Sequence, residues 1–497
     1  MPISYKKVAI LFIVFSTFVR LLISYFLEFG NDEVYYWLYA KYPAISHFDH
    51  PPMVGFFIQF FTGNLFFESE FFIRLAAIIP ASLSMYCIYL IGTFLKNSAT
   101  GFLAVILYNL NFYGFIISGT FILPDSPMVF FWLISFFLFL QLLPKNPDEI
   151  NNNIKLFFAF FFLGCAIYSK YQAVYLLFAV VLFVIFFNSK WLKSKAFYLG
   201  LLFPFIAIFL IFYWNYSNDF ISFKFHNNRV SIFSLNFNKQ SFFREILGQI
   251  VYTNPYVFFV IVVALLNIKK RNIDSDYNAF FLLTSIPLIV TTIYLSLFKN
   301  TLPHWSGISY LTLIPLGAAQ LVNKNRIEKK LLIFFAVLSL IFMVGLFVIN
   351  SGFLIPKITS LKIEEQGRKD VFMDLYGWKQ TSEKVNNILE KENLTHLPIV
   401  SKGWFPTAHI DYYIARPNKM NVFALGNLPE IHKYYWINKC RFDKDFKEAL
   451  YITDSRNFTN PEDILSDFKI QKPIDTIPVI REKNTVKNVF IYLIKKD

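Results

Sequence analysis

Two adjacent carboxylates, Asp32 and Glu33, follow the first apolar stretch of the chain and stand just before Tyr35. Neighbouring carboxylates repel each other, so at least one should be paired with a cation or an acceptor hydroxyl. A carboxylate at the end of a membrane span can accept a proton from an acceptor nucleophile or orient it. The alternative is an N-cap acid that starts an interfacial helix, followed by aromatic residues at the membrane interface.

The loop that follows carries His47, Asp49 and His50 directly before two prolines, Pro51 and Pro52. These are metal-ligand types, but two histidines three residues apart with one acid make a weak metal site. The same side chains can orient a sugar, or they can belong to a turn in which the prolines fix the chain as it re-enters the membrane. No cofactor is certain from this pattern, and a divalent metal stays an open alternative.

Further polar groups stand singly at the ends of apolar stretches. Asp125 lies between two prolines, where an N-cap is the alternative role. Lys170 can bind a phosphate as a point charge, or its side chain can extend to the lipid headgroups. Arg229 and His304 add a guanidinium and an imidazole, whereas Trp305 is also typical of a membrane-interface aromatic.

These residues indicate a chemistry as a set. Lys170, Arg229 and His304 suit a lipid-linked phosphate leaving group, because cations stabilise the charge that develops on a departing phosphate. A carboxylate such as Asp32 would then handle the attacking nucleophile. We expect His47, Asp49, His50, Asp125, Tyr35 and Trp305 to bind the sugar or the acceptor, or to shape the pocket.

The composition shows what kind of protein must position these groups. The 497 residues are 56% apolar, 20% aromatic and only 16% charged, and mean hydropathy is +0.46. An ordinary soluble enzyme and a disordered chain are both excluded by these values. The net charge of +14 comes from short basic clusters between apolar runs, which argues against nucleic-acid binding. Three cysteines offer no disulfide framework.

About eleven apolar stretches are long enough, or nearly so, to cross a bilayer. They fall near residues 8–27, 71–95, 100–119, 122–143, 155–169, 172–188, 196–214, 249–267, 278–298, 305–322 and 331–350. Basic residues gather in alternate short connections, such as 190–195 and 269–271. By the positive-inside rule these connections are cytoplasmic, which places the loops 28–70 and 215–248 on the outer side.

The region after residue 350 has an ordinary charge content and a different pattern. Short strand-like runs at 397–400, 419–423, 448–452 and 489–494 accompany a helical pattern at 376–390. We therefore expect a transmembrane catalytic domain over residues 1–355 and a soluble α/β domain over residues 356–497. An odd number of spans places that second domain outside as well.

Several motifs, taken in order, resemble a known family. Asp32-Glu33 with Tyr35-Tyr36-Trp37, followed by Phe48 to Pro52, is similar to the first outer loop of the bacterial family 39 glycosyltransferases. These are the relatives of the dolichyl-phosphate-mannose protein mannosyltransferases and the aminoarabinose–lipid A transferases. Weaker matches follow at Pro124–Pro127, Ser169–Tyr171, Trp214-Asn215, Gly248-Gln249, His304-Trp305 and, in the last domain, Gly377-Trp378.

The resemblance implies a mainly α, polytopic membrane protein with the GT-C fold, with about 11–13 transmembrane helices and a C-terminal soluble α/β domain. It implies an inverting glycosyltransferase that moves one sugar from a polyprenyl-phosphate donor, with Asp32 as the catalytic candidate and Glu33 supporting it. The spacing between the acidic pair and the prolines differs from that of the aminoarabinose transferases, so neither sugar nor acceptor follows from it.

The expected setting is the inner membrane of a bacterium, with membrane lipids around the spans and the site facing the periplasm. Lipid A or a surface glycan is the expected acceptor, and no nucleic-acid partner is expected. A protein O-mannosyltransferase is the alternative within the class. A polytopic lipid or glycan transporter, or a non-catalytic envelope assembly factor, is the alternative outside it, although a transporter favours charges near the middle of the membrane.

Overall fold

The computed structural model describes residues 4–147, 153–230, 237–270, 273–324, 326–353, 362–441, 446–465 and 468–496. The chain divides into two compact units. The first, called here the membrane unit, comprises Met1–Ser24 and Ala44–Leu340; the second, the C-terminal unit, comprises Tyr25–Pro43 and Ile341–Asp497. The expected domain boundary at residues 355–356 and the middle of the expected loop 215–248 lie outside the described residues.

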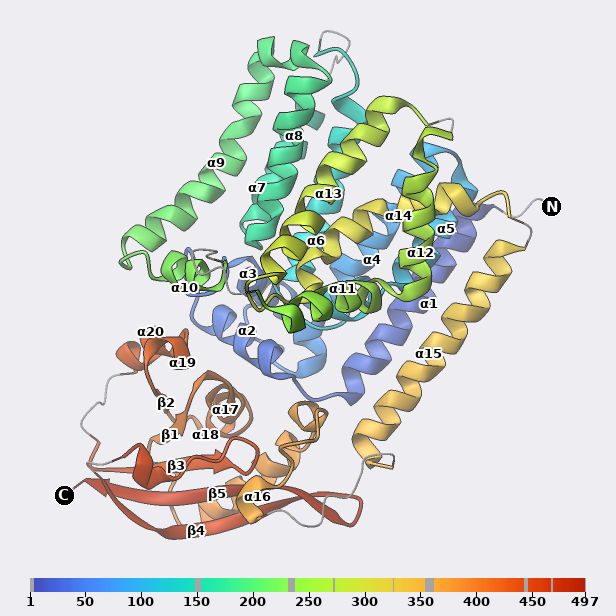
Figure 1. The fold of residues 1–497 in the computed structure, drawn as a ribbon. Helices are drawn as coiled ribbons and strands as arrows, with labels where there is room; N and C mark the ends of the chain where they lie inside the picture. Colours follow the sequence, from blue (N-terminus) through green and yellow to red (C-terminus); the bar gives the residue numbers. More distant parts are fainter. Residues whose placement is uncertain are drawn as a thin grey trace. The chain divides into compact units, whose positions relative to one another are not determined.

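The membrane unit is built from helices (Figure 1). They are α1 (Tyr5–Phe26), α3 (Met53–Thr62), α4 (Glu70–Leu95), α5 (Ser98–Leu110), α6 (Asp125–Leu142), α7 (Asn153–Ile167), α8 (Val174–Phe186), α9 (Lys195–Tyr216), α10 (Ile221–Val230), α11 (Lys239–Thr253), α12 (Pro255–Leu266), α13 (Ser275–Ser296), α14 (Gly307–Leu321) and most of α15 (Ile327–Ser351). Ten of the eleven apolar stretches each coincide largely with one of these helices, whereas the stretch 249–267 holds the end of α11 and the whole of α12.

Among the described residues, six helices are long and apolar enough to cross a membrane by themselves: α1, α4, α6, α9, α13 and α15. The helices α3, α5, α7 and α8 are apolar but shorter. Backbone groups in hydrocarbon must be satisfied within the element, which explains why the apolar stretches fold as helices. The protein is therefore a multi-pass membrane protein.

One expected span is broken. The stretch 249–267 does not form a single straight helix, because α11 and α12 meet at an angle of 97°. Asn254 takes a positive φ of 73° at the break, and its side chain accepts a hydrogen bond from the amide of Tyr256. Pro255 is the first residue of α12, a position where its missing N–H costs nothing. The two helices together make up to a seventh span.

The C-terminal unit contains one five-stranded sheet in the order β2-β1-β3-β5-β4 (Figure 1). Its strands are β1 (Ile399–Lys402), β2 (Val422–Leu425), β3 (Glu448–Asp454), β4 (Phe468–Arg481) and β5 (Asn484–Lys496). β1 is parallel to β2 and β3, whereas β5 is antiparallel to β3 and β4. The expected α/β composition of the tail is therefore confirmed.

Helices complete this unit. They are α2 (Asn31–Lys41), α16 (Trp378–Lys391), α17 (Trp404–Ile410), α18 (Arg416–Asn418), α19 (Leu428–Ile431) and α20 (Tyr434–Cys440), with a π-helical turn at Asp411–Ala415 after α17. α2 comes from the first outer loop, nearly 340 residues before α16, yet it packs against α17. The sequence contained no signal for this association.

Candidate active site

Asp125 is the centre of a buried polar cluster in the membrane unit. It is the first residue of α6, and its carboxylate accepts a hydrogen bond from the Tyr113 hydroxyl at 2.7 Å and another from the Lys170 ammonium at 2.7 Å. Asp125 and Lys170 are each only 3% exposed. The expected alternatives, an N-cap for Asp125 and a headgroup contact for Lys170, do not describe these bonds. A buried ion pair of this kind depends on both partners, because losing one leaves an uncompensated charge.

Tyr113 was not predicted as a site residue, and the local backbone explains how it reaches Asp125. It begins a π-helical turn, Tyr113–Ile117, that follows α5. The Asn111 side chain accepts a hydrogen bond from the amide of Gly114 and so interrupts the helix. Gly307 lies against the Tyr113 ring, where a Cβ would come within 2.4 Å of it. The tyrosine therefore needs a glycine on the neighbouring segment.

Two histidines lie within electrostatic reach of the Asp125–Lys170 pair. Burial lowers the pKa of His50 to about 3, although the carboxylate of Asp49 acts in the opposite direction. Burial also lowers the pKa of His304 to about 4, with Lys170 acting in the same direction. Both imidazoles are therefore neutral at pH 7, so they contribute hydrogen-bonding groups, and Lys170 contributes positive charge.

A second group of rings joins α10 to the loop before the double proline. The His226 ring nitrogen lies 2.9 Å from the backbone oxygen of Asp49. The His226 ring also packs on the Tyr171 ring, with 5.1 Å between the centroids, and the centroid of the His50 ring lies 6.4 Å from that of His226. Burial lowers the pKa of His226, while its bond to the Asp49 carbonyl raises it. This contact brings two distant predicted segments together.

The remaining predicted residues of the membrane unit differ in their exposure. Arg229 is exposed near the end of α10, with its guanidinium 4.8 Å from the Phe225 ring centre. His47 is buried, only 3% exposed. Trp305 is partly exposed in the short 3₁₀ turn Pro303–Ser306, beside His304, and its amide donates to the oxygen of Leu302.

A buried polar network, which the sequence analysis did not predict, supports the turn that carries His304. Glu245 of α11 is 0% exposed, and its carboxylate accepts from the Thr301 hydroxyl at 2.6 Å. Gln249 donates to the same carboxylate at 2.8 Å. One turn of α11 also packs tightly here, because a Cβ on Gly248 would come within 2.3 Å of the Pro303 ring. α11 and the start of the turn thus form one packed element.

The acidic pair lies in the C-terminal unit, at the start of α2, and its two members differ. The Glu33 carboxylate accepts a hydrogen bond from the amide of Gly30 at 3.1 Å in a capping arrangement, and Glu33 is 2% exposed. Glu33 is thus the third residue of α2 in a capping box and not its N-cap, which is Gly30. Asp32 is exposed to solvent. Tyr35 is buried, and its hydroxyl accepts from the amide of Lys433 at 3.3 Å.

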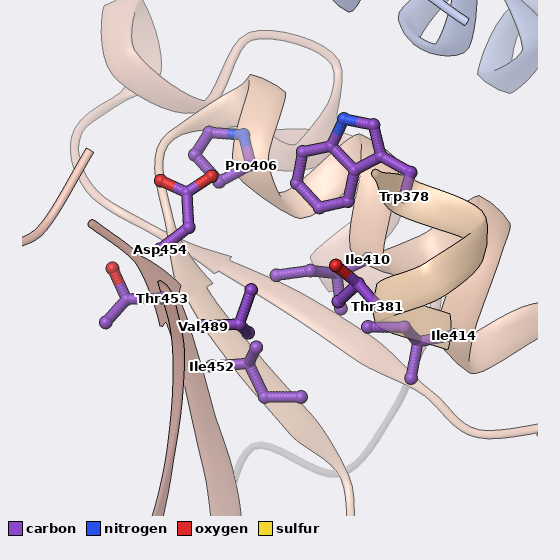
Figure 2. Close-up of a pocket in the computed structure, with 9 residues that line it drawn as sticks. All are labelled: Trp378, Thr381, Pro406, Ile410, Ile414, Ile452, Thr453, Asp454 and Val489. Atoms are coloured by element: carbon purple, nitrogen blue, oxygen red, sulfur yellow. The ribbon is translucent and has the colours of Figure 1, made fainter. Parts of the chain in front are cut away.

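A small hollow in the C-terminal unit does not offer a second site. Figure 2 shows Trp378 and Asp454 among the lining residues, most of which are apolar. The Trp378 ring stacks on His409 at 4.1 Å, and the Lys487 ammonium lies 3.8 Å from its centre. Two groups this close cannot share one face, so both faces of the indole are covered. A sugar or base could not stack on it.

Metal binding has no support from the geometry of the described ranges. In the parts of the chain that the structure describes, no three His, Cys, Asp or Glu side chains gather as a metal site requires. The loop with His47, Asp49 and His50 is included in that search, and its Asp49 backbone oxygen bonds to His226.

Comparison with known proteins agrees with this architecture. The sequence model of the family described as dolichyl-phosphate-mannose-protein mannosyltransferase matches residues 49–214, about a third of the chain. ArnT from Cupriavidus metallidurans bound to undecaprenyl phosphate is similar in structure, with a TM-score of 0.62, 10% identity and 98% of each chain covered. The apo state of ArnT from the same organism gives a TM-score of 0.59 at 12% identity, again over 98% of each chain. No curated protein sequence matches the chain.

The protein has the fold of the GT-C membrane glycosyltransferases. The matched segment contains Asp125, Lys170 and the histidine loop from Asp49 onward, so the sequence match and the buried cluster coincide. The expected fold class is therefore confirmed. The family match over residues 49–214 supports the expected enzyme class, glycosyltransferase. The roles of the individual residues remain predictions.

Proposed function

We propose that the protein is a glycosyltransferase that moves one sugar from a polyprenyl-phosphate donor to an acceptor of the bacterial envelope, with lipid A or a surface glycan as the first choice. The observation that carries the proposal is the buried Asp125–Lys170 pair with Tyr113, inside the segment that matches the mannosyltransferase family. A similar fold is seen with undecaprenyl phosphate bound, which supports a lipid-phosphate donor for this chain.

Lys170, Arg229 and His304 hold the donor phosphate in this proposal. An ammonium has three N–H donors, and the bond to Asp125 uses one of them, so Lys170 can still donate to phosphate oxygens. His304 is neutral and donates a hydrogen bond. Arg229 is exposed on α10 and supplies a second positive charge. As the bond from the anomeric carbon to the phosphate oxygen breaks, these donors stabilise the charge on the leaving phosphate.

Asp32 acts on the acceptor. It is exposed, whereas its neighbour Glu33 is used in capping α2, so Asp32 has the accessible carboxylate of the pair. The acceptor oxygen attacks the anomeric carbon opposite the phosphate in a single displacement that inverts the configuration. For a hydroxyl acceptor, Asp32 takes the proton; for an acceptor phosphate, which is already ionised, Asp32 only orients the nucleophile.

The remaining site residues of the proposal bind the sugar or the acceptor or shape the pocket: His47, Asp49, His50, Asp125, Tyr35 and Trp305. No cofactor is assigned, and a divalent metal remains open to direct test by chelation of the purified enzyme.

The protein resides in the inner membrane, and both the active site and residues 356–497 face the periplasm. A reporter active only in the cytoplasm, fused at Asp497, should therefore be inactive.

Mass spectrometry of lipid A and surface glycans tests the function. A deletion strain is complemented with the wild-type gene or with the Asp32→Asn variant, and membrane levels of both proteins are matched. We expect one sugar-sized mass to disappear on deletion, to return with the wild type and to stay absent with the variant. Unchanged spectra in the deletion strain would remove lipid A and surface glycans as acceptors.

Protein O-mannosylation is the second candidate, favoured by the family match over residues 49–214. The same strains distinguish the two functions. A hexose-sized mass lost from periplasmic proteins, with intact lipid A and surface glycans, would assign the second function.

A further inference from the structure

The segment that carries Asp32 is anchored to the C-terminal unit on both sides of α2. Before the helix, the Glu28 carboxylate accepts from the amides of Trp378 and Lys379 at 2.6 and 3.2 Å, at the start of α16. The amide of Phe29 donates to the Tyr413 hydroxyl at 2.9 Å. Two residues later, the Asn31 side-chain oxygen lies 2.9 Å from a ring nitrogen of His409. Each anchor is supplied by a residue more than 340 positions away.

The other end of α2 is held by a buried ion pair. Asp411 is 1% exposed, and its carboxylate accepts from the Arg441 guanidinium at 2.5 Å and from the Tyr434 hydroxyl at 3.0 Å. Arg441 also donates to the Tyr42 hydroxyl at 2.9 Å, directly after α2. The Lys41 ammonium lies 3.6 Å from the second oxygen of Asp411. The pair therefore contacts α2 through its last residue and the residue after it.

The helix needs this support. An isolated helix of 11 residues is marginal in water. α2 also lacks one apolar stripe, because eight of its residues, from Glu33 to Ala40, are buried. Its Trp37 ring packs on Tyr412, and its Tyr35 ring packs on Trp404. The fold of the C-terminal unit thus determines where the first turn of α2, with Asp32, lies.

We propose that Asp411 and Arg441 are positioning residues for Asp32, because they hold α2 in place within the C-terminal unit. The inference rests on the proposed function of Asp32. Catalytic groups must be held within a fraction of an ångström, and a misplacement of about 1 Å can cost about 100-fold in rate. Neither residue needs to touch substrate for this effect.

Two measurements on full-length enzyme in nanodiscs test the proposal. The variants are Asp411→Asn, Arg441→Lys, which keeps the charge but shortens the reach to Tyr42, and the milder Tyr434→Phe. Hydrogen exchange of the 28–43 segment reports the position of α2 without reference to activity. For Asp411→Asn and Arg441→Lys we expect faster exchange in this segment and a kcat at least tenfold lower, with the donor KM nearly unchanged. For Tyr434→Phe we expect a smaller increase in exchange and a smaller loss of kcat.

The matched control is a second ion pair of the same unit. Arg481 donates to Asp370 and to the oxygen of Ile349, and neither residue has a described contact with α2. Asp370→Asn should lower stability without faster exchange at 28–43 and without the loss of kcat. Faster exchange with unchanged kcat, or slow exchange with lost kcat, overturns the positioning role. Full activity of Asp32→Asn would instead overturn the proposed function, so the two failures are distinguishable.

Discussion

Two acidic residues, Asp125 and Asp32, have opposite surroundings. Asp125 is buried in the membrane unit and bonded to a phenol and an ammonium, whereas Asp32 is exposed in the first turn of a helix that belongs to the C-terminal unit. A carboxylate with both oxygens bonded in a buried site has little freedom to accept a proton. A solvent-exposed carboxylate can receive an acceptor. The contrast favours the proposed division of roles, in which Asp125 organises charge and Asp32 acts on the nucleophile.

The largest loss of activity without a loss of stability should come from Asp32→Asn. If Asp32 takes the acceptor proton, kcat falls by about 10² to 10⁴, the usual contribution of a general base. Thermal stability in detergent should change little, because Asn has the size and shape of Asp. Asp219→Asn, at another exposed acid, is the control and should keep full activity. A residual activity within a few-fold of wild type would remove Asp32 from the proton transfer.

The variant Lys170→Met tests the role of the buried Asp125–Lys170 pair. Removing the cation leaves the Asp125 carboxylate buried and uncompensated, which should lower the free energy of unfolding by about 3–5 kcal/mol and abolish transfer. The double variant Asp125→Asn with Lys170→Met removes both charges and should recover much of the stability, but no activity. Recovery of activity as well would show that the pair is structural and does not bind the donor.

A pH titration of stability probes the neutral histidines of the Asp125 cluster. His304 has its pKa lowered to about 4, below the value of about 6.5 in an unfolded chain. Between these values the unfolded state binds a proton that the folded state does not, so stability is fully present above pH 6.5 and falls towards pH 4. The slope should be up to about 1.4 kcal/mol per pH unit for this group. His304→Gln should reduce the slope; an unchanged slope in unfolding experiments at pH 4–7 contradicts the assignment.

Features that depend on neighbouring residues in the sequence could be predicted, whereas features that depend on distant residues could not. The eleven apolar stretches became helices because hydrocarbon leaves the backbone no other partner. The strands β1, β2, β3 and β5 overlap the four short apolar runs, but β4 was missed because Pro473 and Pro478 interrupt its pattern. β4 is an edge strand of the sheet, where proline is tolerated.

The pairings between distant residues could not be predicted in the same way. The bond from Tyr113 to Asp125 depends on a π-helical turn and on the space left by Gly307, and neither has a signature in hydropathy. The association of residues 25–43 with the C-terminal unit depends on bonds such as that of Arg441 to Tyr42, across about 400 positions. The chemistry-bearing residue types could be found from the sequence, whereas their partners are properties of the fold.

The smallest effect separates the two members of the acidic pair. Glu33 accepts from the amide of Gly30, and Gln at the same helix position can also cap. Glu33→Ala should therefore lower stability by about 1 kcal/mol, as for the loss of a helix cap, and loosen the first turn of α2. Glu33→Gln should keep both stability and most of the activity, because the cap needs an acceptor oxygen and no charge. If transfer assays instead show the same large loss for both variants at unchanged stability, the negative charge of Glu33 takes part in the reaction and the division of roles within the pair is wrong.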